Sequence, residues 1–208
     1  MQKPFNFSVV GETVLTQKLN CRPAPAPALS LKTAIDRDLI AFWYQPKIDL
    51  KKRRVVGAEC FARISHPLHG IISPAHFLAG AADEEIIELT HRALLAALKF
   101  SARMDDMGIY FKIAINVSVE SLVHFPVELL LKHRPQNDQW PGLLVEVEEA
   151  QLLNRIVTLR DKLQAIEKFG ISLAIDNFGR GNSSFAAFRC LPFSEIKIDP
   201  SFIQGCAN

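Results

Sequence analysis

The stretch ISLAIDNFG, residues 171–179, decides the fold class of this chain. Its mostly apolar first half, Ile171 to Ile175, is typical of a buried strand. Two polar residues, Asp176 and Asn177, follow before a glycine-containing loop. An amphipathic helix is expected just before it, over residues 154–169, with Gly170 as its C-cap. A helix that leads into a buried strand is the repeating unit of a parallel sheet.

The same unit recurs along the chain. Strands are expected at residues 40–48, 55–64, 110–117, 143–147 and 195–198, and helices at 30–38, 74–79, 84–107, 121–133 and 183–190. Short apolar strands separated by helices predict an α/β fold with a parallel sheet covered by helices. No GxGxxG motif follows the first strand, which argues against a dinucleotide-binding fold. We therefore expect a β/α barrel, whose active-site residues lie at the C-terminal ends of the strands.

Composition narrows the class of protein. The 208 residues are 49% hydrophobic and 22% charged, which is typical of one folded globular domain. A net charge of +2 gives no reason to expect binding to nucleic acid or to a membrane surface. No secretory leader and no membrane-spanning run is recognisable, so a cytoplasmic protein is expected. Residues 1–29 are expected to be an extension with a Pro/Ala linker, and residues 30–208 the domain.

Polar residues occur where the expected strands end. Glu59, Asn116, Glu146 and Asp176 each interrupt or end an apolar strand. A buried charge costs several kcal/mol unless it is paired or bound to a metal. In a barrel these ends converge, and carboxylate and amide oxygens suit Mg²⁺, Mn²⁺ or Ca²⁺. The alternative is that the carboxylates cap helices or pair with Arg and Lys, and the sequence leaves both interpretations open.

The residues around these positions resemble the EAL domain family. The similarity runs from about residue 31 to the end of the chain, and ordered blocks are more specific than any single motif. The blocks are YQPKIDL (44–50), ECFAR (59–63), HPLHG (66–70), AINVS (114–118), EVEE (146–149), DNFGRGNSS (176–184) and IKIDPSFI (196–203).

This resemblance implies a modified TIM (β/α) barrel whose first strand is antiparallel to the others. It also implies a bacterial signalling protein that binds cyclic di-GMP and, with two Mg²⁺ or Mn²⁺ ions, cuts it to the linear dinucleotide. Ca²⁺ is expected to be a non-productive ion. By position, the implied roles are metal binding for Glu59, Asn116, Glu146, Asp176 and Asn177, substrate binding for Gln45 and Arg63, positioning of the attacking water for Lys197, and anchoring of a loop for Glu149.

Two departures from the family pattern bear on activity. Asn177 stands where the family has a second Asp, so a second ion loses a charged ligand. About six strands are expected where the family barrel has eight, and the family's later Glu does not occur. A regulator with impaired catalysis is therefore expected, which acts through a protein partner, through a homodimer or by binding cyclic di-GMP. An active phosphodiesterase is the alternative.

Overall fold

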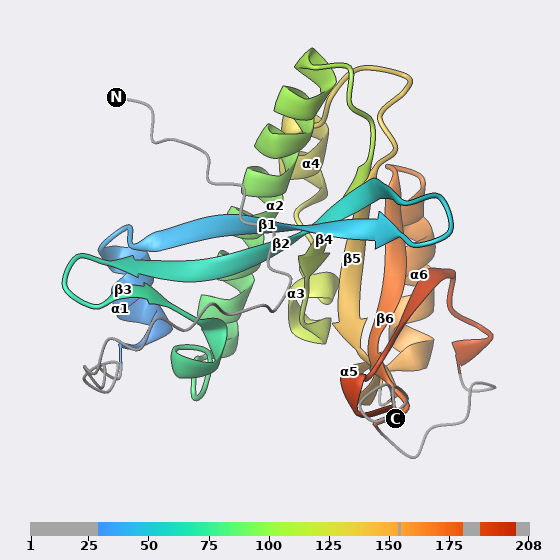
Figure 1. The fold of residues 1–208 in the computed structure, drawn as a ribbon. Helices are drawn as coiled ribbons and strands as arrows, with labels where there is room; N and C mark the ends of the chain where they lie inside the picture. Colours follow the sequence, from blue (N-terminus) through green and yellow to red (C-terminus); the bar gives the residue numbers. More distant parts are fainter. Residues whose placement is uncertain (1–28, 154, 181–187, 203–208) are drawn as a thin grey trace, which may run out of the picture.

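The computed structural model describes residues 29–153, 155–180 and 188–202 (Figure 1). They form one sheet with strand order β1-β2-β4-β5-β6-β7, and β3 pairs with β2. The strands are β1 (Ile40–Asp49), β2 (Arg54–His66), β3 (Gly70–Ile72), β4 (Lys112–Asn116), β5 (Leu143–Glu148), β6 (Ile171–Phe178) and β7 (Phe193–Ile198).

Strand directions confirm the expected class of fold. Strands β1 and β3 are both antiparallel to β2, whereas β2, β4, β5, β6 and β7 run parallel to one another. Within the described residues, β1 and β7 do not pair, so this part of the barrel is open. The described residues therefore have a TIM-like architecture with an antiparallel first strand, and their sheet is not closed.

The helices follow from local sequence signals. Ser30 caps α1, and its hydroxyl accepts a hydrogen bond from the Thr33 amide at 3.2 Å. Helix α2 begins with three acidic residues, which favour the positive end of the helix dipole. The helices are α1 (Leu31–Asp36), η1 (Pro74–His76), α2 (Asp83–Asp106), α3 (Val119–Val123), α4 (Val127–His133), α5 (Glu149–Leu153), α6 (Ile156–Glu167) and η3 (Pro200–Phe202).

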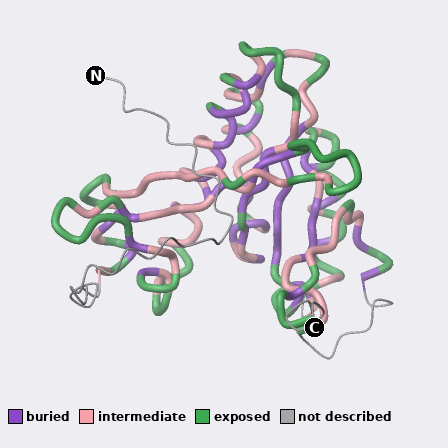
Figure 2. Tube along the Cα trace, viewed as in Figure 1, coloured by how far each residue is buried: buried purple, intermediate pink, exposed green. Residues whose placement is uncertain are grey.

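The core lies between the sheet and the helices on one of its faces. Helix α2 packs against β4, and α6 packs against β6. The central strands are buried along most of their length (Figure 2), and β5 is buried in all but its last residue. On the opposite, inner face, Ala114, Leu144 and Ala174 form a separate small buried cluster. Both faces of the central strands are therefore covered, as the apolar runs in the sequence predicted.

Some expected elements differ from the observed ones. The helix expected over residues 74–79 is only the short η1, because Phe77 leaves helical geometry with φ −129° and its ring is buried. The helix expected over residues 121–133 divides into α3 and α4. Strand β3 and helix α5 were not expected.

Two expectations concern segments that lie wholly or mostly outside the described residues. Most of the helix expected over residues 183–190 lies outside the described residues. Residues 1–28 of the expected N-terminal extension also lie outside them. In the described part of the chain, no helix is long and apolar enough to cross a bilayer.

Candidate functional site

Strand alternation places the predicted site residues on the inner face. Asn116, Glu146 and Asp176 each follow a member of the small inner cluster by two residues on the same strand. Side chains two residues apart on a strand point to the same side. Glu59 joins this face because it is the register partner of Ala114. The four strand-end residues named from the sequence therefore come from four neighbouring strands and face one region.

Lys197 is the centre of this region. Its ammonium lies 2.6 Å from Glu146 Oε2, 3.0 Å from Glu59 Oε2 and 3.3 Å from Asp176 Oδ1. The Glu146 side chain is fully buried, and the side chains of Glu59, Asp176 and Lys197 are between 13% and 28% exposed. Pairing therefore satisfies carboxylates that would otherwise be costly to bury.

The charge of Glu146 depends on its surroundings. Burial raises the pKa of Glu146, and repulsion from Glu59 adds to this effect. Lys197 and Lys47 act in the opposite direction. Burial alone would lower the pKa of Lys197, but the hydrogen bond and charge of Glu146, with Glu59 and Asp176, raise it above its ordinary value. We infer that the ammonium is the internal counter-ion of this carboxylate cluster.

Asn116 completes the group of possible cation ligands. Its side-chain nitrogen donates to Glu59 Oε1 at 2.9 Å. Three carboxylates and an amide oxygen are a donor set that suits Mg²⁺, Mn²⁺ or Ca²⁺, so the residues fit such an ion by their chemistry. Among the described residues, however, no three Asp, Glu, His or Cys side chains stand at the spacing of a ready-made metal site. A divalent cation would therefore have to displace the Lys197 ammonium from part of the cluster.

Residue 177 adjoins the cluster with an amide side chain. Asn177 has φ 53°, a left-handed conformation that Asn tolerates better than most residues. Its backbone amide donates to Asp176 Oδ1 at 2.9 Å, and its side-chain nitrogen donates to Glu148 Oε1 at 3.3 Å. The Asn177 amide group is therefore oriented towards Glu148, a residue for which the sequence predicted no role.

Glu149 has a buried position at the start of α5. It is 2% exposed, and its Oε2 accepts a hydrogen bond from the Gly179 amide at 2.9 Å. This contact ties the segment after β6 to the end of β5. Such a position agrees with the loop-anchoring role that the family resemblance implies, and that role stays a prediction.

The two predicted substrate-binding residues lie on neighbouring strands. Gln45 on β1 is exposed and is the register partner of Glu59. Arg63 on β2 donates to the Ala62 carbonyl at 2.9 Å, and its guanidinium carbon lies 5.2 Å from the centre of the Phe61 ring. Burial lowers the pKa of Arg63, but an Arg keeps its charge at any physiological pH. Gln45 is therefore beside the carboxylate cluster, and Arg63 lies two side-chain positions beyond Glu59 on the same face.

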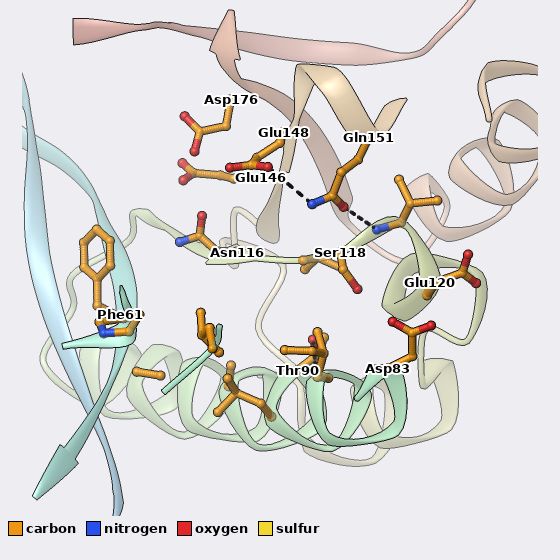
Figure 3. A pocket seen from close by; sticks show the side chains of 18 of the residues that line it. Phe61, Asp83, Thr90, Asn116, Ser118, Glu120, Glu146, Glu148, Gln151 and Asp176 are labelled. Atoms are coloured by element: carbon orange, nitrogen blue, oxygen red, sulfur yellow. Dashed lines mark hydrogen bonds between the residues drawn. The ribbon is translucent and has the colours of Figure 1, made fainter. Parts of the chain in front are cut away.

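A pocket of about 800 Å³ opens beside the cluster. Figure 3 shows the carboxylates of Glu146, Glu148 and Asp176 gathered on one side of it, with Asn116 close by and α2 on the far side. Apolar lining comes from Phe61, Ala62, Pro74 and Leu78. Its volume lies within the range of small-molecule sites, and its walls combine apolar surface with a few polar groups.

Two charged residues beside the cluster were missed from the sequence, namely Lys47, which contacts Glu146, and Glu195, which contacts Lys47. Lys47 on β1 reaches Glu146 Oε1 at 3.3 Å and Glu195 Oε2 on β7 at 2.7 Å. Its register partner on β2 is Gly57, where an added Cβ would collide with the Lys112 carbonyl oxygen at 2.8 Å and would only touch the Lys47 side chain. The available signal was the period of two, since Lys47 follows Gln45 by two residues and Glu195 precedes Lys197 by two.

Comparison with known proteins gives one family. A family model described as "EAL domain" matches residues 28–208. The signaling protein YkoW of Bacillus subtilis is 31% identical over 204 residues, which covers 96% of this chain and 24% of that protein. The chain spans about a quarter of the length of the curated relatives it matches.

Solved structures share the fold. The phosphodiesterase PaMucR in complex with c-di-GMP has a TM-score of 0.73 at 29% identity, with 86% of this chain and 74% of that chain covered. BlrP1 of Klebsiella pneumoniae, in a calcium and cyclic di-GMP complex, has a TM-score of 0.62 at 26% identity, with 80% and 42% covered. A manganese complex of the same protein is also similar, with a TM-score of 0.61.

Proposed function

Since this chain belongs to the EAL domain family, we propose that it binds cyclic di-GMP at the mouth of the sheet and acts as a regulator with impaired hydrolysis. The observation that carries the proposal is the assembly of Glu59, Glu146 and Asp176 around Lys197 beside the pocket. The named ligand comes from the relatives, because PaMucR and BlrP1 have been solved with it.

The pocket suits the chemistry of a cyclic dinucleotide. Its phosphodiesters are anionic, and a guanidinium such as that of Arg63 pairs well with phosphate oxygens. Its bases are flat and apolar on their faces, which matches the ring of Phe61 in the lining. Divalent cations at Glu59, Asn116, Glu146 and Asp176 would offset the charge between these carboxylates and the phosphates.

Impaired hydrolysis is proposed because of residue 177. A divalent cation held by Glu59, Asn116, Glu146 and Asp176 would polarise the phosphate and lower the pKa of a bound water. Asn177 offers a neutral oxygen where the family pattern has a carboxylate, and its amide nitrogen already donates to Glu148. The chain would then bind the nucleotide and hold Lys197 in place, but it would catalyse the hydrolysis only slowly.

Binding and hydrolysis are measured on one sample. Isothermal titration calorimetry with cyclic di-GMP is run with Mg²⁺, Mn²⁺, Ca²⁺ and no cation, and chromatography follows the linear dinucleotide. We expect binding that needs a cation, with slow product formation. Asp176→Asn is expected to weaken binding, whereas Asp161→Asn, an exposed residue paired with Arg160, leaves it unchanged. Absence of heat under all four conditions would refute the proposal.

Active hydrolysis is the second candidate function. It is favoured by the contact of Lys197 with three carboxylates and by the anchoring of Gly179 on Glu149. The relative PA2567 of Pseudomonas aeruginosa, 31% identical over 168 residues, is described as a cyclic di-GMP phosphodiesterase. Many turnovers per hour with Mn²⁺, lost in a Lys197→Met sample that circular dichroism shows to be folded, would establish this candidate over a regulator with impaired catalysis.

A protein partner is part of the regulatory proposal. Within the described residues, β1 and β7 each have one edge without a paired strand. Unpaired edges are surfaces on which another strand can add. Light scattering at several concentrations tests for a homodimer. A monomer at all of them would exclude this form of regulation.

A further inference from the structure

Glu148 differs from the other carboxylates of the site in its charge balance. Glu146 and Asp176 both contact the ammonium of Lys197. In the described part of the chain, no Lys, Arg or His lies within ion-pair distance of Glu148. Its contacts are two neutral amides, Asn177 Nδ2 at 3.3 Å and Gln151 Nε2 at 3.4 Å. Glu148 therefore keeps an uncompensated negative charge at the rim of the pocket.

Its position brings this charge to the metal-ligand candidates. Glu148 follows Glu146 by two residues on β5, so both point to the inner face. It is also the register partner of Asp176. Figure 3 shows the Glu148 carboxylate beside those of Glu146 and Asp176. Glu148 thus lies on the same side of the sheet as Asp176 and beside it, as an additional ligand of a cation held by Asp176 would.

The side chain of Gln151 supports this placement. It donates to Glu148 Oε2, and its own oxygen accepts a hydrogen bond from the Val119 amide at 3.1 Å. Val119 begins α3, three residues after Asn116. The chain of contacts from Asn177 through Glu148 and Gln151 to α3 holds the carboxylate from two sides. These two hydrogen bonds fix the orientation of the Glu148 carboxylate, but they do not neutralise its negative charge.

We propose that Glu148 supplies the carboxylate for a second divalent cation at this rim, next to the neutral oxygen of Asn177. In this arrangement a carboxylate on the neighbouring strand β5 holds the cation, while residue 177 still lacks the charged ligand on whose absence the proposed impairment of hydrolysis rests. The inference rests on the proposed function, because it assumes that the mouth takes divalent cations. It does not depend on whether cyclic di-GMP is bound or cut.

The test is a Mn²⁺ titration of the full chain without nucleotide, followed by calorimetry and by the electron paramagnetic resonance signal of free Mn²⁺. Loss of one charged ligand is expected to weaken the second Mn²⁺ site of Glu148→Gln by about tenfold or more. The matched control is Glu120→Gln, since Glu120 lines the same pocket but is paired with Arg155 at 2.7 Å. That control is expected to bind Mn²⁺ as the parent chain does.

A charge exchange separates a ligand from a structural residue. The double variant Glu148→Gln with Asn177→Asp returns the carboxylate to residue 177 and is expected to recover the second Mn²⁺ site. A structural role for Glu148 would give no such recovery. The proposal is overturned if the parent chain binds fewer than two Mn²⁺ ions, if Glu148→Gln and Glu120→Gln behave alike, or if the double variant stays weak. Failure of cyclic di-GMP to bind would refute the proposed function and leave this result standing.

Discussion

Replacement of Lys197 by Met is expected to destabilise the fold strongly. The ammonium of Lys197 lies within 3.3 Å of three carboxylates, and the Glu146 side chain is fully buried. Removal of one partner from a buried ion pair costs about 3–5 kcal/mol. Lys47 still reaches Glu146 Oε1 at 3.3 Å, so the lower end of that range applies. We expect the free energy of unfolding to fall by about 3 kcal/mol at about pH 9, well above the pKa of about 7 to which Glu146 is raised.

Urea denaturation followed by circular dichroism measures this loss, provided that the slope with urea is unchanged. Lys32→Met is the control, because Lys32 pairs with Asp36 at 3.6 Å on an exposed helix surface. Its effect should stay below about 0.5 kcal/mol. The deficit of Lys197→Met should shrink as the pH falls through 7, since the pKa of Glu146 is raised to about 7 and its protonation removes the buried uncompensated charge. A loss below about 1 kcal/mol, or a loss independent of pH, would refute the reasoning.

Three further outcomes are expected. The pKa of Glu146 is raised from 4.5 to about 7. The stability that this shift contributes is therefore fully present below pH 4.5 and is lost as the pH rises through 7. Glu146→Gln should flatten the dependence of the urea-derived unfolding free energy on pH in this range. Tyr44→Phe removes the hydrogen bond from the Tyr44 hydroxyl to the Ala96 carbonyl at 2.9 Å and should cost about 1 kcal/mol in thermal unfolding. Gly142→Ala should lower the free energy of unfolding by more than about 2 kcal/mol, because φ is +84° and the new methyl group would collide with the Gly170 carbonyl. Gly80→Ala is the control, because the space around Gly80 is open, and it should cost only about 1 kcal/mol.

The sequence was sufficient to predict the six main strands and the two long helices, α2 and α6. Strands β5 and β6 are mostly apolar runs followed by polar or turn residues. Helix α2 has an apolar stripe at helical spacing. These signals are local, so they can be read without knowledge of the fold. The segment around Phe77 was predicted less well, because burial of that ring in the cluster below α1 outweighs its local helical pattern.

The sequence by itself also determined that Glu59, Asn116, Glu146 and Asp176 face one region, because parallel strands with a period of two carry their end residues to the same edge. Only the tertiary structure decided what surrounds them. Lys47 and Glu146 are 99 residues apart, and they meet because the sheet curls until β1 lies near β5 and β7. Side-chain contacts of this kind depend on the curvature and register of the whole sheet, which local patterns do not contain.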